Sequence, residues 1–121
     1  MRTSLLIDAH VHIYPNFDLD RAIRSGLENF HSAETNGDTV KVWLLTERSD
    51  CHFFRDALTF KLDNYHFVET GDDPVLRVKS NAHDPLLYIV AGRQLISSDD
   101  LEICALATRF SRMTGRLIRS I

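Results

Sequence analysis

Two histidines and an aspartate near the N-terminus have the types and the spacing of metal ligands. Asp8, His10 and His12 alternate with apolar residues in the stretch 5–13, LLIDAHVHI. A β-strand sends successive side chains to opposite faces, so we expect these three on one face. The opposite face would carry the apolar residues Ile7, Ala9, Val11 and Ile13.

Imidazoles two residues apart on a strand lie roughly 6.5–7 Å apart at Cα, and both reach one ion at about 2.0–2.1 Å. Asp8 would bind the same ion or accept an N–H from a ligand histidine. The stretch therefore predicts a metal site. The alternative is an edge strand that carries polar residues on one side.

A second group of reactive side chains follows the stretch 39–46, TVKVWLLT, which predicts another strand. Glu47 is either a metal ligand and general base, or a solvated charge paired with Arg48. His52 is either a ligand or proton shuttle, or an ordinary residue in the first turn of a helix. Arg48 and Arg93 would clamp a phosphate or carboxylate of a substrate, or lie on the surface.

These residues are positioned by a strand–helix–strand unit. Apolar residues at helical spacing predict a helix over 19–33 with Asp18 as its N-cap: Leu19, Ile23, Leu27 and Phe30. Such a unit favours parallel pairing of its two strands with a right-handed crossover. Because parallel strands end at one rim of a sheet, His10, His12 and Glu47 would lie there together.

The rest of the chain predicts a short helix and several more strands. Asp50 would cap a helix over 51–62, and the turn 70–74 would join two strands in a hairpin. We expect the aromatic residues Trp43, Phe53, Phe54 and Phe60 in the core. The expected strands cover 65–69, 75–79, 86–91, 93–97 and 101–107, and a last helix covers 114–121.

Composition suits one globular α/β domain over residues 1–121. The chain is 44% hydrophobic and 26% charged, with a net charge of −3 that argues against nucleic acid as the main partner. It has no apolar run long enough to cross a membrane and no signal peptide, so we expect a cytoplasmic protein. In that compartment Cys51 and Cys104 would be reduced.

The residues Ile7 to His12 resemble the H-x-H signature on the first strand of metal-dependent hydrolases. Two superfamilies of α/β barrels use it, the amidohydrolases and the PHP (polymerase and histidinol phosphatase) domains. The order of later segments is similar to PHP domains. Residues 44–48 stand where a T-D-H motif is found, residues 90–95 resemble a G-x-E strand, and residues 101–106 resemble its hairpin partner. The chain departs from these motifs at Glu47, Arg48 and Gln94, which replace aspartate, histidine and glutamate.

The resemblance implies a mixed, largely parallel sheet with flanking helices, similar to the first half of a distorted (β/α) barrel. A whole barrel needs roughly 200 residues or more. The chain would therefore be an incomplete barrel, part of a longer protein, or one copy of a homo-oligomer.

The implied activity is hydrolysis of a small phosphoester, with an amide or related C–N bond as second choice. Zn, Mn or Fe would be held by Asp8, His10, His12 and Glu47 and would activate water, with Asp8, Glu47 and His52 as catalytic residues. The alternative is a fold that has lost catalysis and serves as a binding or assembly module.

Overall fold

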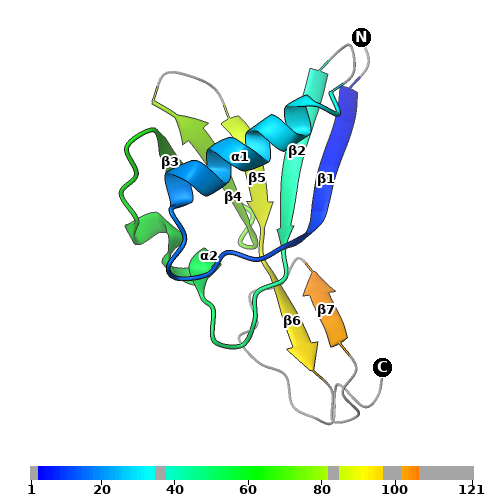
Figure 1. Ribbon diagram of the computed structural model, residues 1–121, viewed down its shortest axis with the longest axis vertical. Coiled ribbons are helices and arrows are strands. Elements are labelled where there is room, and N and C mark those ends of the chain that lie inside the picture. The colour runs from blue at the N-terminus through cyan, green and yellow to red at the C-terminus, as the bar shows by residue number, and fades with distance from the viewer. Residues whose placement is uncertain (1–2, 35–37, 82–84, 97–101, 107–121) are drawn as a thin grey trace.

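A computed structural model of the chain defines residues 3–34, 38–81, 85–96 and 102–106 (Figure 1). The expected helix over 114–121 lies outside these residues. None of the described helices is long and apolar enough to cross a membrane. In chain order the elements are β1 (Thr3–Val11), α1 (Leu19–His31), β2 (Asp38–Leu45), α2 (Phe53–Asp56), a 3-10 turn (Ala57–Thr59), β3 (Tyr65–Glu69), β4 (Val75–Ser80), β5 (Pro85–Val90), β6 (Gly92–Ile96) and β7 (Glu102–Leu106).

Five of the strands form one sheet in the order β1-β2-β5-β4-β3. The pairs β1–β2 and β2–β5 are parallel, whereas β4–β5 and β3–β4 are antiparallel. The α/β class and the mixed sheet are therefore confirmed, but the sheet is not largely parallel. The reason is the tight β3–β4 hairpin, whose turn contains Gly71 at a φ of 96°, a conformation that glycine adopts without steric cost.

The remaining two strands, β6 and β7, form a separate antiparallel hairpin, as the sequence predicted. β6 follows β5 with only Ala91 between them, so one extended run of chain serves both sheets (Figure 1). The N–H of Glu47 donates to the carbonyl of Gly92, and the N–H of Gln94 donates to the carbonyl of Glu47. These bonds continue the parallel β2–β5 pairing into the start of β6.

Helix α1 lies across one face of the five-stranded sheet (Figure 1). It begins as predicted, since the Asp18 carboxylate accepts a 3.1 Å hydrogen bond from the N–H of Arg21. Ile23 and Phe30 are buried beneath it. Gly26 lies against the ring of Trp43, where any Cβ would overlap the indole. The residue types along α1 therefore set how closely the helix approaches the sheet.

Helix α2 is shorter than the sequence predicted. It covers only Phe53–Asp56, with one 3-10 turn after it, and Asp50 does not cap it. Phe53 and Phe54 are buried against the same face of the sheet as α1, and the Phe53 ring meets Phe67 of β3 at a centroid distance of 5.6 Å. Phe60 was expected in the core but is 39% exposed. Packing of the two buried phenylalanines thus fixes one turn, and the chain then leaves the helix.

The opposite face of the sheet carries apolar side chains that no described helix covers. Leu5 and Ile7 of β1 lie on this face and are 60% and 48% exposed. Half-buried apolar residues of β2 and β5 continue it: Val42, Leu44, Tyr88 and Val90. We call these six residues the open face.

Candidate functional site

A one-residue bulge in β1 decides where its polar side chains lie. Asp8 pairs with Trp43 and Val11 with Leu45, so three steps along β1 match two along β2. The Asp8 carboxylate accepts the N–H of His10 at 3.4 Å within this irregular segment. Such a bulge changes the face to which later side chains point. The sequence-based alternation is therefore wrong across the bulge: Ile7 is exposed, whereas Val11 and Ile13 are buried.

The bulge separates Asp8 from the two histidines. Asp8 shares a face with the buried Trp43, on the helix side of the sheet. His10 and His12 flank the buried Val11 and point to the other side, with ring centroids 4.7 Å apart. The predicted pair of imidazoles is thus brought together, and the aspartate is not brought to it.

His12 has an unsatisfied polar atom. Its Nδ1 is buried and has no hydrogen-bond partner among the described residues. Its ring also stacks on Tyr14 at a centroid distance of 6.0 Å. A buried nitrogen without a partner is costly and is typical of sites that take a ligand, an ion or water.

Gln94 provides a second such atom at the same rim. Its side-chain Oε1 is buried and, among the described residues, without a hydrogen-bond partner. Gln94 follows Arg93, which pairs with Glu47, so its side chain emerges on the face opposite to theirs. Alternation therefore directs the Gln94 side chain to the same side as the imidazole pair, although Gln94 lies on β6 and the histidines lie at the end of β1.

Glu47 faces the other way and is occupied by the backbone. It is only 3% exposed, and its carboxylate accepts the N–H groups of Phe53 at 2.5 Å and Phe54 at 3.3 Å. Burial raises the pKa of Glu47, although these two bonds and the charge of Arg93 lower it. Glu47 is thus neither a solvated charge nor near the imidazoles; it takes the capping role expected of Asp50.

Arg93 holds the loop between β2 and α2. Its side chain is 5% exposed, and Nη1 donates to the carbonyls of Arg48 at 2.8 Å and Cys51 at 2.6 Å. Its Nη2 lies 2.8 Å from Nδ1 of His52. A guanidinium with its donors directed at three loop acceptors is a structural clamp, and it does not lie on the surface.

The other residues of this loop divide between surface and core. Arg48 is exposed and lies 4.0 Å from the Asp50 carboxylate. His52 is half-buried, and burial lowers its pKa, with Arg55 and Arg93 adding to the effect. Burial also raises the pKa of the Cys51 thiol. Within the described residues Cys51 and Cys104 form no disulfide.

The seven predicted site residues therefore fall into separate places. His10 and His12 form one pair, Glu47, His52 and Arg93 form a buried cluster on the helix side, and Asp8 and Arg48 belong to neither. Across residues 3–34, 38–81, 85–96 and 102–106, no group of three or more His, Cys, Asp or Glu side chains is arranged to hold a metal ion.

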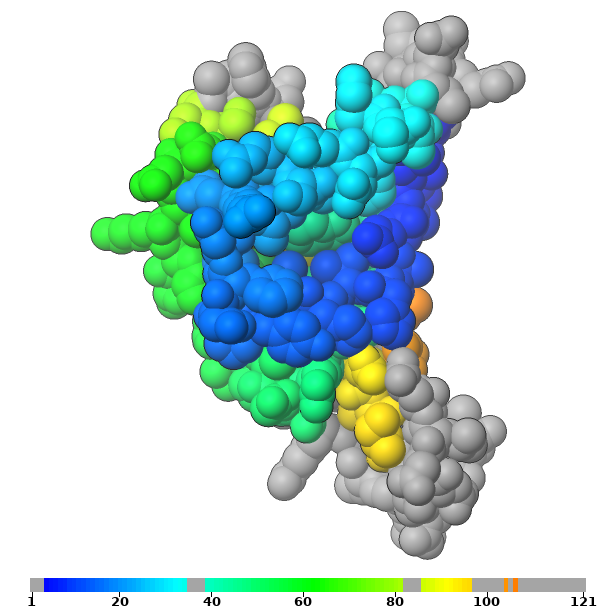
Figure 2. Space-filling model, in the orientation of Figure 1, coloured from blue at the N-terminus to red at the C-terminus, as the bar shows by residue number. Residues whose placement is uncertain are grey.

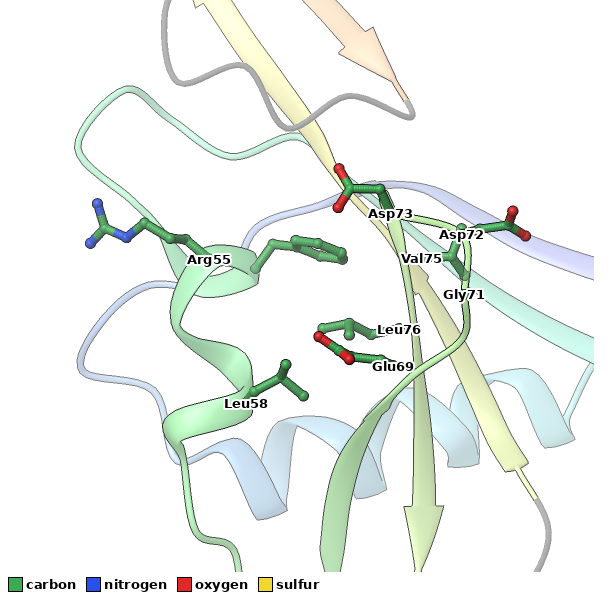
Figure 3. Close-up of a pocket in the computed structure, with 9 residues that line it drawn as sticks. Arg55, Leu58, Glu69, Gly71, Asp72, Asp73, Val75 and Leu76 are labelled. Atoms are coloured by element: carbon green, nitrogen blue, oxygen red, sulfur yellow. The ribbon is translucent and has the colours of Figure 1, made fainter.

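A cavity of about 240 Å³ lies between α2 and the β3–β4 turn (Figure 3). Glu69, Asp72 and Asp73 line it. In Figure 3 Leu58 and Leu76 point into the space together with Glu69, whereas Asp72 and Asp73 point away from it. The three acidic groups therefore do not converge in this cavity.

A second cavity, of about 280 Å³, was missed by the sequence analysis. It lies between the loop that precedes α1 and the α2 segment, which meet on the face shown in Figure 2. Four aromatic side chains line it: Tyr14, Phe17, Phe53 and Phe60. The aromatic residues themselves were visible in the sequence. Phe53 and Phe60 were assigned to the core, and Tyr14 and Phe17 were not considered together with them.

Comparison of the chain with known proteins gives no relative from which to assign these residues: no family model, curated protein or solved structure matches it.

Proposed function

We propose that the chain binds a divalent metal through His10 and His12 and is the N-terminal part of a PHP-like metal-dependent hydrolase. The observation that carries the proposal is the contact of the two imidazoles at the carboxyl end of β1, with Nδ1 of His12 buried and unpaired among the described residues. Neutral imidazole nitrogens are common ligands of Zn and Fe.

The residues that fit a metal are fewer than the sequence suggested. His10 and His12 supply imidazoles, and the unpaired Oε1 of Gln94 lies on the same side as a weak oxygen ligand. Asp8 and Glu47 do not fit, because the bulge turns one away and the other caps α2. A bound divalent metal would lower the pKa of a coordinated water and so supply hydroxide near neutral pH. The substrate class we favour is a small phosphoester.

A second candidate is a fold that has lost catalysis and acts as a binding or assembly module. It is favoured by the buried carboxylate of Glu47, whose oxygens both accept backbone N–H groups. It is also favoured by the neutral Gln94 at the position where PHP domains have a bridging glutamate. In this case the imidazole pair would bind a metal for structure only, or no metal.

The half-barrel interpretation rests on the layering of the sheet. The parallel β1–β2–β5 strands carry helices on one face, and the other face presents the six apolar residues of the open face. In a barrel this side would face the interior. We propose that a second copy of the chain, or a C-terminal half, covers it.

The first experiment is metal analysis of protein purified without chelators. Wild-type protein and the double variant His10→Ala/His12→Ala are compared, with His66→Ala as the control, because His66 is an exposed histidine on β3. Near-stoichiometric metal in the wild type and control, and its loss in the double variant, is the expected result. Wild-type protein without metal that also binds none when Zn²⁺, Mn²⁺ or Fe²⁺ is added would contradict the proposal.

A second experiment separates the two candidates. The metal-loaded protein is tested for phosphate release from simple phosphomonoesters, with the double histidine variant as the blank. Release that depends on both histidines supports the hydrolase. Stoichiometric metal without phosphate release, combined with a loss of thermal stability when the metal is removed, supports the module.

A further inference from the structure

Arg77 of β4 has a donor that nothing in the described part of the chain accepts. Its Nε is buried and has no hydrogen-bond partner among the described residues. A guanidinium is always charged and has only donors, so a buried Nε–H without an acceptor is costly. Buried polar atoms in native proteins nearly always have a partner, and an atom of this kind therefore indicates a ligand, an ion or an ordered water molecule.

The neighbours of Arg77 in the sheet are apolar or neutral. Leu76 and Val78, before and after it, are buried in the core on the helix side, so the Arg77 side chain points to the opposite side of the sheet. There it lies between its two cross-strand partners, Val68 of β3 and Tyr88 of β5. Neither of these side chains carries a charge that balances the half-buried guanidinium.

Lys79 adds a second positive charge on the same side. It follows Arg77 by two residues along β4, roughly 6.5–7 Å at Cα, and it is also half-buried. Its cross-strand partners are His66 of β3 and Pro85 of β5, so neither is acidic. Among the described residues neither Arg77 nor Lys79 forms an ion pair. Two neighbouring cations without a carboxylate repel each other, and this part of the sheet therefore attracts an anion.

We propose that Arg77 and Lys79 bind a phosphate group. An oxyanion that approaches a guanidinium from the side accepts from Nε–H and from one Nη–H, which uses the donor that is otherwise unpaired. Lys79 supplies a point charge, and the exposed His66 supplies an imidazole N–H, which it has in either protonation state. A phosphate carries more charge and more acceptor oxygens than a carboxylate, so it matches two cations better.

This site is separate from the proposed metal site and does not need it. Arg77, Tyr88, Val42 and Ile7 form one cross-strand row, so three strand spacings of roughly 4.8 Å lie between β4 and β1. The two imidazoles come still later in β1. One phosphate group therefore cannot contact both sites, and the failure of one proposal leaves the other standing.

The test follows the Nε–H of Arg77 in isotope-labelled protein. Inorganic phosphate is titrated at constant ionic strength without added metal, with acetate as the matched anion, and the arginine Nε–H resonances are recorded by NMR. We expect a saturable shift of the Arg77 resonance, which is identified by its loss in Arg77→Lys, and tighter binding of phosphate than of acetate. Absence of a saturable shift, or equal affinities for the two anions, would overturn the proposal.

Variants separate the geometry of the guanidinium from simple charge. Arg77→Lys keeps the charge but loses the paired donors, so phosphate should bind about tenfold more weakly in titration calorimetry. Lys79→Gln should weaken binding about twofold to fivefold. The controls Arg24→Lys and Lys61→Gln change exposed residues elsewhere and should bind phosphate as the wild type does. Unchanged binding in both Arg77→Lys and Lys79→Gln would assign any phosphate site to another part of the chain and overturn the proposal.

One further ligand identifies the source of the phosphate group. Phenyl phosphate carries the same group on an apolar ring, which would lie against Val68 and Tyr88, the apolar or neutral neighbours of Arg77. Tighter binding of phenyl phosphate than of inorganic phosphate supports the site and assigns it to a phosphorylated organic ligand. The reverse order supports the site and assigns it to the free anion.

Discussion

The guanidinium of Arg93 and the imidazole of His52 lie 2.8 Å apart, Nη2 to Nδ1, across the loop that joins β2 to α2. Arginine has only donors, so Nδ1 must accept and the ring proton must be on Nε2. The same guanidinium donates to the carbonyls of Arg48 and Cys51. One buried side chain therefore fixes both the path of this loop and the tautomer of its histidine.

Replacement of Arg93 by lysine should destabilise the protein strongly. Lysine cannot direct donors at three acceptors in one plane, so at least one loop carbonyl loses its partner. We expect a loss of about 2–4 kcal/mol in the free energy of unfolding, measured by urea denaturation. Arg48→Lys, at an exposed position in the same loop, is the control and should change stability by less than about 0.5 kcal/mol. Equal effects of the two changes would contradict the clamp.

The ionisation of His52 should respond to its surroundings. Burial, Arg55 and Arg93 all lower the pKa of His52, so we expect NMR titration to place it below the ordinary value of about 6.5. Arg55→Gln removes an exposed positive charge and should raise this pKa. Because the folded-state pKa is the lower one, the stability that His52 contributes is present above pH of about 6.5 and is lost as the pH falls. A His52 that titrates above its ordinary value would refute the arrangement.

Glu47 should make the opposite contribution to the pH dependence of stability. Burial raises the pKa of Glu47 in the folded state, so the folded protein binds a proton more tightly than the unfolded chain. Its contribution is thus fully present below the ordinary glutamate pKa of about 4.3 and is lost as the pH rises through the folded-state value. The stability of the wild type relative to Glu47→Gln should therefore fall over this window. Urea denaturation of both proteins at a series of pH values measures this difference, and a difference that does not change with pH would contradict the raised pKa of Glu47.

Gly26→Ala should separate α1 from the sheet. A Cβ at this position overlaps the Trp43 indole, and the indole is buried. We expect a destabilisation of about 1–3 kcal/mol from overpacking, despite the higher helix propensity of alanine, measured by chemical denaturation with Trp43 fluorescence. Ser25→Ala, one residue earlier and exposed, should be neutral or slightly stabilising. A stabilised Gly26→Ala would mean that the helix sits farther from the sheet.

The open face should control self-association, if a second copy covers it. Leu5→Lys places a charge on this face, at a side chain that is already 60% exposed, so the fold should survive. Sedimentation should show a dimer or larger species in the wild type and a monomer in the variant. Leu58→Lys, at a 50% exposed leucine on the helix side, should behave as the wild type. A wild-type protein that is monomeric at high concentration would show that a second copy does not cover the open face.

Local patterns in the sequence were sufficient to predict much of the fold. The helical spacing of apolar residues and the Asp18 cap predicted α1, and alternation with turn residues predicted the β3–β4 and β6–β7 hairpins. The length of α2 was not predictable in this way. It depends on the burial of Phe53 and Phe54 and on a cap from Glu47, which is six residues away from Phe53.

The candidate site was predicted in its parts but not in its arrangement. The residues at the rim were correctly placed at strand ends, yet their grouping depends on which face each strand presents at its last residue. A single extra residue in β1 moves Asp8 away from His10 and His12. Similarly, the Thr46 side chain points away from the helices, so that of the next residue, Glu47, points toward them and pairs with Arg93. Alternation alone does not reveal a bulge, because the bulge depends on pairing with β2.

The bulge in β1 also allows this strand to lose one residue. Asp8 lies opposite Trp43 and Val11 opposite Leu45, with one residue more between them on β1 than on β2. Deletion of Ala9 would make the two counts equal, so Asp8 and Val11 would keep their partners and their faces in a regular ladder. Loss of one codon is therefore a change that this segment can absorb without turning its later side chains to the other face of the sheet.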